Sequence, residues 1–253
     1  MKLKIMTFNI RCKNGGDGIN CFNNREPKVL RAINDEQPDL IGFQEVTDYQ
    51  REFLRKNLSD KYIVLGCGRG ANFYGESVCI AMKRDVFELV SFDTFWLSDT
   101  PDVPGSRYEN SDQSNCPRFT VHAELISKEL AAPIHFFNTH LDHKGEEARL
   151  LGMRAIIDKL SSLSGKYILT GDFNAGPLSP EIAEIKSSQA IECTDATESI
   201  THTFHGFGQF ESDRKIDYIF TNATSLGSHI VTQPSDDGIY ISDHHPVCAT
   251  LEI

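Results

Sequence analysis

Six apolar segments of the chain end or begin in polar side chains that could share one site. They are MTFNIR with Asn9, LIGFQEV with Glu45, IHFFNTHLDH with His140, Asp142 and His143, YILTGDFNA with Asp172 and Asn174, KIDYIF with Asp217, and ISDHHPV with Asp243, His244 and His245. Ligand-binding groups collect at strand ends and in the loops beyond them in α/β folds. If these ends meet, they form a pocket of carboxylates, imidazoles and amides.

This set of side chains favours a hard divalent cation. Mg²⁺ prefers oxygen ligands and keeps waters for substrate and nucleophile. Glu45 and Asp243 are suitable ligands, and Asn9 is a neutral oxygen donor. The predicted cofactor is therefore Mg²⁺, with Mn²⁺ as the alternative.

The same set contains the groups that hydrolysis of a phosphate ester needs. His244 titrates near neutral pH and could orient or deprotonate water, and Asp217 is the natural partner that fixes its tautomer. Asn174 and His140 could donate hydrogen bonds to phosphate oxygens as negative charge develops. Asp172 could align the attacking water or assist the leaving group.

Each of these residues also has an ordinary structural explanation. An Asp or Asn at a strand end is more often a turn residue, and Glu45 could be the first solvated residue of a loop. His245 should face away from His244, because neighbouring strand residues point to opposite sides. The functional interpretation depends on six strand ends supplying the parts of one site.

The elements that must position these residues are short strands alternating with helices. Strands are predicted at residues 3–10, 40–44, 63–66, 77–83, 87–97, 118–126, 134–139, 167–170, 216–221, 229–232 and 246–253. Asn24 as N-cap and Pro27 in the first turn predict a helix that continues through Ile33. Further helices are expected around 49–58 and over 145–163, where Leu151, Ala155, Ile156, Leu160 and Leu163 form an apolar stripe.

Three long loops are predicted at residues 11–23, 98–117 and 201–215, and loops of this length are commonly functional. No internal repeat or low-complexity linker divides the 253 residues. We therefore expect one domain over residues 1–253.

The motifs TFNIR, QEV, NTHLDH, GDFNA, IDYIF and SDHHPV, in this order, resemble the endonuclease/exonuclease/phosphatase superfamily. The superfamily includes deoxyribonuclease I, abasic-site endonucleases, neutral sphingomyelinases, inositol polyphosphate 5-phosphatases and the deadenylase/nocturnin branch. The resemblance runs from Asn9 to Pro246. It implies a magnesium-dependent phosphoesterase with a deoxyribonuclease I-like fold: an α/β four-layer α/β/β/α sandwich, with two mixed sheets face to face and helices outside.

The resemblance also implies roles for individual residues. Asn9 and Glu45 match the metal-site Asn and Glu, Asp243 matches an Asp near the metal, and Asp172 and Asn174 match the Asp and Asn of GDFN. His244 matches a catalytic base or phosphate ligand, and Asp217 matches its acidic partner. His140 matches a second catalytic His, Glu76 matches the carboxylate paired with His140, and Arg118 matches a phosphate-contacting Arg.

Other motifs look like a bacterial subfamily similar to the deadenylase/nocturnin branch. They are TFWLSDTP, NTHLDHKGEEAR and TFHGF. His143, Arg149, His205 and Phe207 from these stretches are candidates for recognition of the leaving group. Loop residues are often bystanders, so these four remain candidates only.

The charge of the chain bears on its substrate. The formal net charge is -11, and Lys and Arg are scattered, whereas the loop at 98–117 carries four acidic residues. Tight binding along a nucleic-acid backbone needs many basic contacts. A phosphorylated small molecule or a short nucleic-acid end is therefore favoured. The alternatives are a 3'-exonuclease-like nuclease on RNA or DNA ends, a sphingomyelinase-like phospholipid hydrolase and a non-catalytic binding module.

The remaining composition indicates a reduced, cytoplasmic protein. The seven Cys are scattered without CxxC spacing, which argues against a disulfide framework or a zinc site. The N-terminal residues lack the apolar core of a signal peptide, and no stretch approaches 20 apolar residues. No membrane association and no obligate protein partner are expected.

Overall fold

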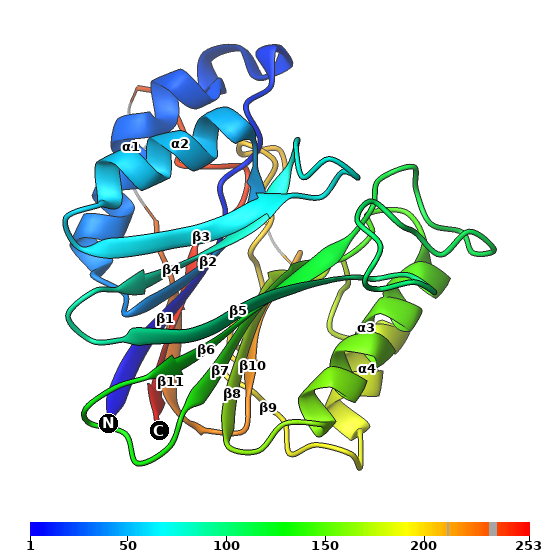
Figure 1. Ribbon diagram of the computed structural model, residues 1–253. Coiled ribbons are helices and arrows are strands. Elements are labelled where there is room, and N and C mark those ends of the chain that lie inside the picture. Colours follow the sequence, from blue (N-terminus) through cyan, green and yellow to red (C-terminus); the bar gives the residue numbers. More distant parts are fainter. Residues whose placement is uncertain (212, 233–236) are drawn as a thin grey trace.

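Two six-stranded mixed β-sheets pack face to face within residues 1–211, 213–232 and 237–253, which this computed structural model describes (Figure 1). The first sheet has the order β11 (Thr224–Ile230), β12 (Val247–Glu252), β1 (Lys2–Asn9), β2 (Leu40–Val46), β4 (Ser77–Lys83) and β3 (Tyr62–Gly68). The second has the order β5 (Glu88–Trp96), β6 (Phe119–Ile126), β7 (Ile134–His140), β8 (Lys166–Asp172), β10 (Asp217–Thr221) and β9 (Thr194–Asp195).

Helices cover the outer face of each sheet (Figure 1). α1 (Phe22–Glu36) and α2 (Asp48–Leu58) pack on the first sheet, and α3 (Glu146–Ser161) and α4 (Pro180–Ser187) pack on the second. A short 3₁₀-helix, η1 (Gly15–Asn20), precedes α1. The predicted four-layer α/β/β/α sandwich is confirmed.

Apolar side chains fill the space between the sheets and the space under the helices. The inter-sheet core contains Leu3, Ile5, Ile80, Val121 and Phe136, all buried. Alternate residues of the same central strands point outward and pack under the helices, so these strands are apolar on both faces. This explains why their sequences read as continuous apolar runs.

The sheets approach one another closely at Gly42 of β2. A Cβ atom at this position would lie 2.0 Å from Thr170 Oγ1 and 2.6 Å from Asn138 Oδ1. The Gln44 amide donates to Asn138 Oδ1 at 2.7 Å, and the Asn138 amide donates to the carbonyl of Phe43 at 2.8 Å. A small polar network therefore joins the two sheets beside the strand ends that carry the candidate site residues.

The first helix begins earlier than the sequence predicts. α1 starts at Phe22, so Asn24 is not its N-cap and Pro27 lies inside it. Phe22 is buried in the core, and the buried Arg25 guanidinium donates to the carbonyls of Asn20, Ile10, Arg11 and Ile241. These tertiary contacts extend the helix beyond its local signals.

The other predicted boundaries agree with the structure to within three residues, except at residues 229–232. The strand there is β11, which begins at Thr224 and ends at Ile230, and its polar, alternately exposed sequence obscured its start. The sequence did not predict η1, α4 or β9. Loop 98–117 contains only turns and bends, and residue 212 of the loop at 201–215 lies outside the described residues.

In the part of the chain that the structure describes, no helix has the length and apolar character needed to cross a bilayer.

Candidate active site

The polar strand ends meet in one cleft of about 380 Å³ at one end of the sandwich. Two parallel strand pairs create this arrangement: β1 with β2 in the first sheet, and β7 with β8 in the second. The carboxyl ends of a parallel pair lie at the same sheet edge, so Asn9 comes close to Glu45, and His140 lies beside Asp172. The cleft is lined by Arg11, Cys12, Glu45, Arg69, Glu76, Cys116, Arg118, His140, His143, Asp172, Asn174, Phe204, Ile216, Asp243 and His244.

Asn9 links the acidic groups contributed by the two sheets. Its Nδ2 donates to Asp172 Oδ2 at 2.9 Å and to Glu45 Oε1 at 3.2 Å, while its Oδ1 accepts from the backbone N–H of Arg11 at 2.9 Å. Asn9 therefore presents its nitrogen, and not the predicted metal-binding oxygen, to the carboxylates. In this arrangement it holds the two carboxylates in place.

Glu45 occupies a strained backbone position. It lies at an irregularity of β2 with a φ of 59°, a conformation that is uncommon for residues with a Cβ atom. The Cys12 backbone N–H donates to Glu45 Oε2 at 3.0 Å. Burial alone would raise the pKa of Glu45, but the Cys12 N–H and the nearby His244 and Arg11 charges outweigh it and lower the pKa. Glu45 therefore remains ionised inside the cleft.

His244 lies between two buried aspartates. Its Nδ1 is 2.9 Å from Asp217 Oδ2, and its Nε2 is 3.7 Å from Asp172 Oδ2. Burial opposes charge on His244, but Asp217 and then Asp172 outweigh it and raise its pKa to about 10. Burial, with a contribution from Asp217, raises the pKa of Asp172 to about 7. At neutral pH the imidazole is therefore a cation, and Asp172 is the group close to its own titration point.

His140 faces Asp172 from the other side. Its Nε2 is 3.5 Å from Asp172 Oδ2, and its Nδ1 is 3.9 Å from Glu76 Oε1. Burial and the Arg118 charge lower the pKa of His140 well below its ordinary value, so it is neutral at pH 7. The nearest partner of Glu76 is Arg69, which binds both carboxylate oxygens at 2.7 and 3.2 Å. Arg69 was not predicted from the sequence, because its pairing with Glu76 depends on the β3–β4 hairpin.

Asn174 follows β8 in a left-handed conformation with a φ of 49°. Its backbone N–H donates to Asp172 Oδ1 at 2.9 Å, and its side-chain amide donates to the Leu141 carbonyl at 3.1 Å. This turn orients Asp172 and places the amide of Asn174 in the cleft lining.

Arg118 and His143 form the basic wall of the cleft, and its positive charge comes from Arg118, because burial and the Arg118 charge lower the pKa of His143. Arg118 Nη2 lies 3.0 Å from His143 Nδ1, and Arg118 Nε lies 3.5 Å from Asp142 Oδ2. The Arg118 residue is only 5% exposed, yet its Nε and Nη1 have no hydrogen-bond partner among the described residues. A buried guanidinium with unpaired donors beside a cleft is suited to binding an anionic ligand.

Arg149 and His205, two candidates for recognition of the leaving group, are absent from the lining of the cleft. Arg149 pairs with the buried Glu181 of α4 and donates to the Asp142 carbonyl at 3.2 Å. His205 packs against the rings of Tyr240 and His245 behind the site. Phe207 likewise packs against Tyr240 and is absent from the cleft lining.

Arg11 is a cleft residue that the sequence did not single out. Its guanidinium lies 3.7 Å from Glu45 Oε2 and 3.7 Å from Asp243 Oδ2, and it pairs with Asp17 at 3.0 Å. Burial, together with Glu45, raises the pKa of Asp243 despite the opposing charges of His244 and Arg11. Arg11 follows the Asn9 motif directly, but a φ of 54° turns it inward, and this turn has no sequence signal.

The donor atoms in the cleft fit a divalent cation. Glu45, His140 and Asp172 each offer a ligand atom within 4.8 Å of the others, and Asp172, Asp217 and His244 form a second such group. Asp243 belongs to neither group, but Asp243 Oδ2 and Glu45 Oε2 both lie 3.7 Å from the Arg11 guanidinium. Carboxylate oxygens dominate this set, and hard cations such as Mg²⁺ and Mn²⁺ prefer oxygen ligands.

Comparisons with known proteins show which family and which solved structures this chain resembles. The chain matches the Endonuclease/Exonuclease/phosphatase family over residues 6–244. An endonuclease/exonuclease/phosphatase from Bacteroides vulgatus superposes with a TM-score of 0.92 and 30% identity, covering 100% of this chain and 99% of that one. A mannosyl-6-phosphatase from Bacteroides thetaiotaomicron superposes with a TM-score of 0.88 and 26% identity, covering 99% and 100% of the two chains.

The likeness extends to more distant proteins at the level of the fold. The human Nocturnin catalytic domain superposes with a TM-score of 0.75 and 18% identity, covering 99% of this chain and 93% of that one. The family match includes all but a few residues at each end and contains every strand end of the cleft. The chain therefore belongs to the endonuclease/exonuclease/phosphatase family.

Proposed function

We propose that this protein is a divalent-metal-dependent phosphoesterase that hydrolyses a phosphate ester by attack of water on phosphorus. Members of its family hydrolyse phosphoester bonds and typically depend on a divalent metal. The observation that carries the proposal is the convergence of Glu45, Asp172 and the Asp217–His244 pair in one cleft. A fold kept only for recognition would not need a buried acid and a charged imidazole 3.7 Å apart.

The acidic end of the cleft would hold the metal. Glu45 and Asp243 are the proposed ligands for Mg²⁺, with Mn²⁺ as the alternative, and Asn9 orients Glu45 through its amide. A bound divalent cation supplies positive charge that polarises the phosphoryl group and stabilises the transition state. Arg11 is positioned to neutralise the remaining negative charge of these carboxylates.

The other residues of the cleft would bind the phosphoryl group and move the proton. His244 is the proposed phosphate ligand, because its raised pKa makes it a hydrogen-bond donor at neutral pH. Asp172 is the proposed acceptor for the proton of the attacking water, because its pKa of about 7 suits a general base. The neutral His140 and the Asn174 amide lie beside Asp172 and could orient the phosphoryl group.

The basic wall favours a compact phosphorylated substrate. Two Arg118 nitrogens have no hydrogen-bond partner in the described part of the chain, and His143 lies next to them, so an anionic group can bind at this side of the cleft. The mannosyl-6-phosphatase from Bacteroides thetaiotaomicron shares 26% identity over almost the whole chain. We therefore propose a sugar phosphate or a similar small phosphomonoester as the preferred substrate class, with short nucleic-acid ends as the alternative.

The first test is the dependence of turnover on metal, Glu45 and His244. Chelation of divalent ions should abolish hydrolysis, and Mg²⁺ or Mn²⁺ should restore it. Glu45→Ala and His244→Ala should each lose at least ~10²-fold in kcat/KM, the usual scale for a positioned acid–base or charge-stabilising group. Glu52→Ala, on an exposed part of α2, is the matched control and should behave as wild type. Wild-type turnover in Glu45→Ala or His244→Ala would contradict the assigned roles.

The second test compares substrates at fixed metal concentration. We expect sugar phosphates to be hydrolysed with higher kcat/KM than dinucleotides or labelled RNA and DNA oligomers. Arg118→Ala should raise KM for the preferred monoester more than it lowers kcat, because Arg118 would bind the anion without taking part in proton transfer. Rapid degradation of long nucleic acid would instead identify a nuclease, and hydrolysis of phospholipid vesicles would identify a sphingomyelinase-like enzyme.

A further inference from the structure

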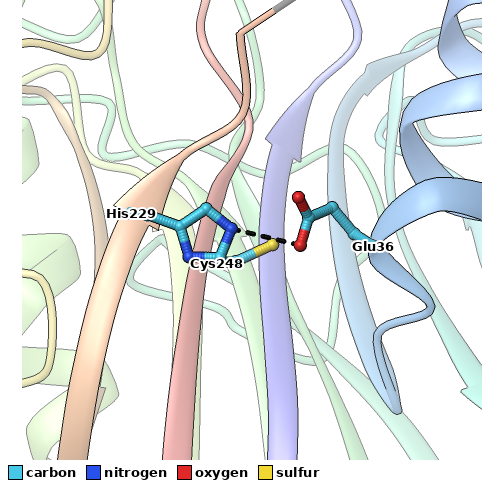
Figure 2. Close-up of side chains that lie close together, drawn as sticks. All are labelled: Glu36, His229 and Cys248. Atoms are coloured by element: carbon cyan, nitrogen blue, oxygen red, sulfur yellow. Dashed lines mark hydrogen bonds and ion pairs between the residues drawn. The ribbon is translucent and has the colours of Figure 1, made fainter.

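A second group of metal-ligating side chains lies outside the cleft, on the helix-covered face of the first sheet. Glu36, His229 and Cys248 point toward one another from α1, β11 and β12 (Figure 2). His229 Nε2 is 3.1 Å from Glu36 Oε2, and one ligand atom from each of the three residues lies within 4.8 Å of the others. None of the three belongs to the lining of the cleft.

Regular secondary structure fixes the backbone of this group. His229 and Cys248 are direct cross-strand partners in the β11–β12 pair, so their side chains emerge side by side on one face of the sheet. Glu36 is the last residue of α1, which packs on that face through Val29, Ala32 and Ile33. The three donors are therefore preorganised by elements far apart in the sequence.

Exposure differs across the group in a way that suits a bound ion. Cys248 is buried at the base, the Glu36 side chain is 19% exposed, and the His229 side chain is 52% exposed. A cation can therefore approach from solvent past the imidazole and meet the sulfur at the bottom.

We propose that Glu36, His229 and Cys248 form a second metal site, which takes a borderline-soft divalent cation of the Zn²⁺ type. Zn²⁺ accepts sulfur, imidazole nitrogen and carboxylate oxygen, and three protein ligands leave a fourth position for water. Mg²⁺ is disfavoured here because it binds thiolate and imidazole poorly. This site is chemically distinct from the oxygen-rich cleft and does not depend on the proposed function.

The ion must displace two groups, the Lys4 ammonium and the proton of the Cys248 thiol. Lys4 Nζ lies 3.2 Å from Glu36 Oε2, but the Lys4 side chain is 35% exposed and can turn to water. Burial raises the pKa of the Cys248 thiol, so binding must release the thiol proton to solvent as the metal–sulfur bond forms. Affinity should therefore increase with pH. A bound ion would tie edge strand β11 to the end of α1.

Cobalt binding to the full-length, metal-free protein tests the site directly. Co²⁺ should produce a thiolate-to-cobalt charge-transfer band in the near ultraviolet, and Zn²⁺ should remove the band by displacement. Cys248→Ser should abolish the band. Cys12→Ser is the matched control, because Cys12 is a partly exposed free thiol in the lining of the cleft, away from the proposed second site. His229→Gln changes a half-exposed side chain and should weaken the band without affecting folding.

Thermal unfolding gives an independent readout. Zn²⁺ at about 100 times its Kd should raise Tm by about 5–10 °C in wild type and in Glu45→Ala, and a chelator should reverse the change. His229→Gln should lose most of the shift. The proposal is overturned if wild type shows no charge-transfer band, if the band survives in Cys248→Ser, or if Cys12→Ser alone removes it.

Discussion

The Asp217–His244 pair decides which protonation states are present in the cleft. Asp217 Oδ2 contacts His244 Nδ1, whereas Asp217 Oδ1 is buried and has no hydrogen-bond partner among the described residues. Burial disfavours charge on the imidazole, but the two aspartates outweigh it and raise the pKa of His244 to about 10. The pair therefore keeps the imidazole a cation at neutral pH, which its proposed role as a phosphate ligand requires.

Asp217→Asn should remove the negative charge that raises the pKa of His244, with little change in the shape of the side chain. The pKa of His244 should fall toward or below its ordinary value of about 6.5, because the main opposing charge to its burial is gone. We expect about a 10²-fold loss in kcat/KM. Titration of the His244 ring followed by NMR in the metal-free protein measures the shift. An unchanged pKa of His244 would show that Asp217 does not stabilise the imidazolium cation.

The same pair affects stability with a defined sign. Because the pKa of His244 is raised on folding, its stabilising contribution is fully present below the unfolded pKa of about 6.5 and is lost as pH rises toward 10. In the metal-free Asp217→Asn protein, the free energy of unfolding should therefore change less between these pH values than in wild type. Denaturant unfolding at several pH values gives this slope.

At the scale of elements, the site depends on how closely the two sheets meet. β2 and β8 are held together at Gly42 by contact with Thr170 and by the hydrogen bonds around Asn138. Glu45 follows Gly42 on β2 by three residues, and Asp172 follows Thr170 on β8 by two. The distance between the sheets at Gly42 therefore fixes the spacing of the two carboxylates that Asn9 bridges.

Gly42→Ala should disturb this contact. The added Cβ would meet Thr170 Oγ1 at 2.0 Å, so the sheets must move apart, and we expect a loss of about 1–3 kcal/mol in the free energy of unfolding. Activity should fall as well, because Glu45 and Asp172 separate. Gly15→Ala is the control, since its Cβ would meet nothing within 4 Å. Equal stability of the two variants in denaturant unfolding would contradict this account of the contact.

At the scale of the whole molecule, negative charge surrounds a cleft with a basic wall. The net charge is -11, and the lining arginines Arg11 and Arg69 are paired with carboxylates, whereas Arg118 of the basic wall has nitrogens without a hydrogen-bond partner among the described residues. Repulsion from the surface acts on every charge of a long polyanion, but a compact phosphate ester can bind within the basic wall. The charge distribution thus supports the proposed preference for small substrates.

The effect of salt on turnover should distinguish a long polyanionic substrate from a compact phosphate ester. Raising ionic strength from about 0.01 M to about 0.15 M shortens the screening length from about 30 Å to about 8 Å. At constant Mg²⁺, kcat/KM for a long single strand should then rise about threefold or more, while the value for a sugar phosphate should change less than about twofold. A large fall with the long strand, as seen for proteins that bind through many phosphate contacts, would contradict this prediction.

The sequence by itself determined the family, the four-layer fold and most strands. Buried strands leave continuous apolar runs, and polar residues that follow them line the cleft. It did not determine where α1 begins, because buried contacts of Phe22 and Arg25 override the local signals at Asn24 and Pro27.

Only the tertiary structure decided which side chains meet. It turned Arg11 into the cleft and Arg149 away from it, joined Arg69 to Glu76, and gave Asn9 a bridging orientation. It also brought Glu36, His229 and Cys248 together, although they are scattered along the chain without any motif. The physical reason is that contacts between distant segments depend on sheet order, register and backbone turns, and spacing in the sequence records none of these.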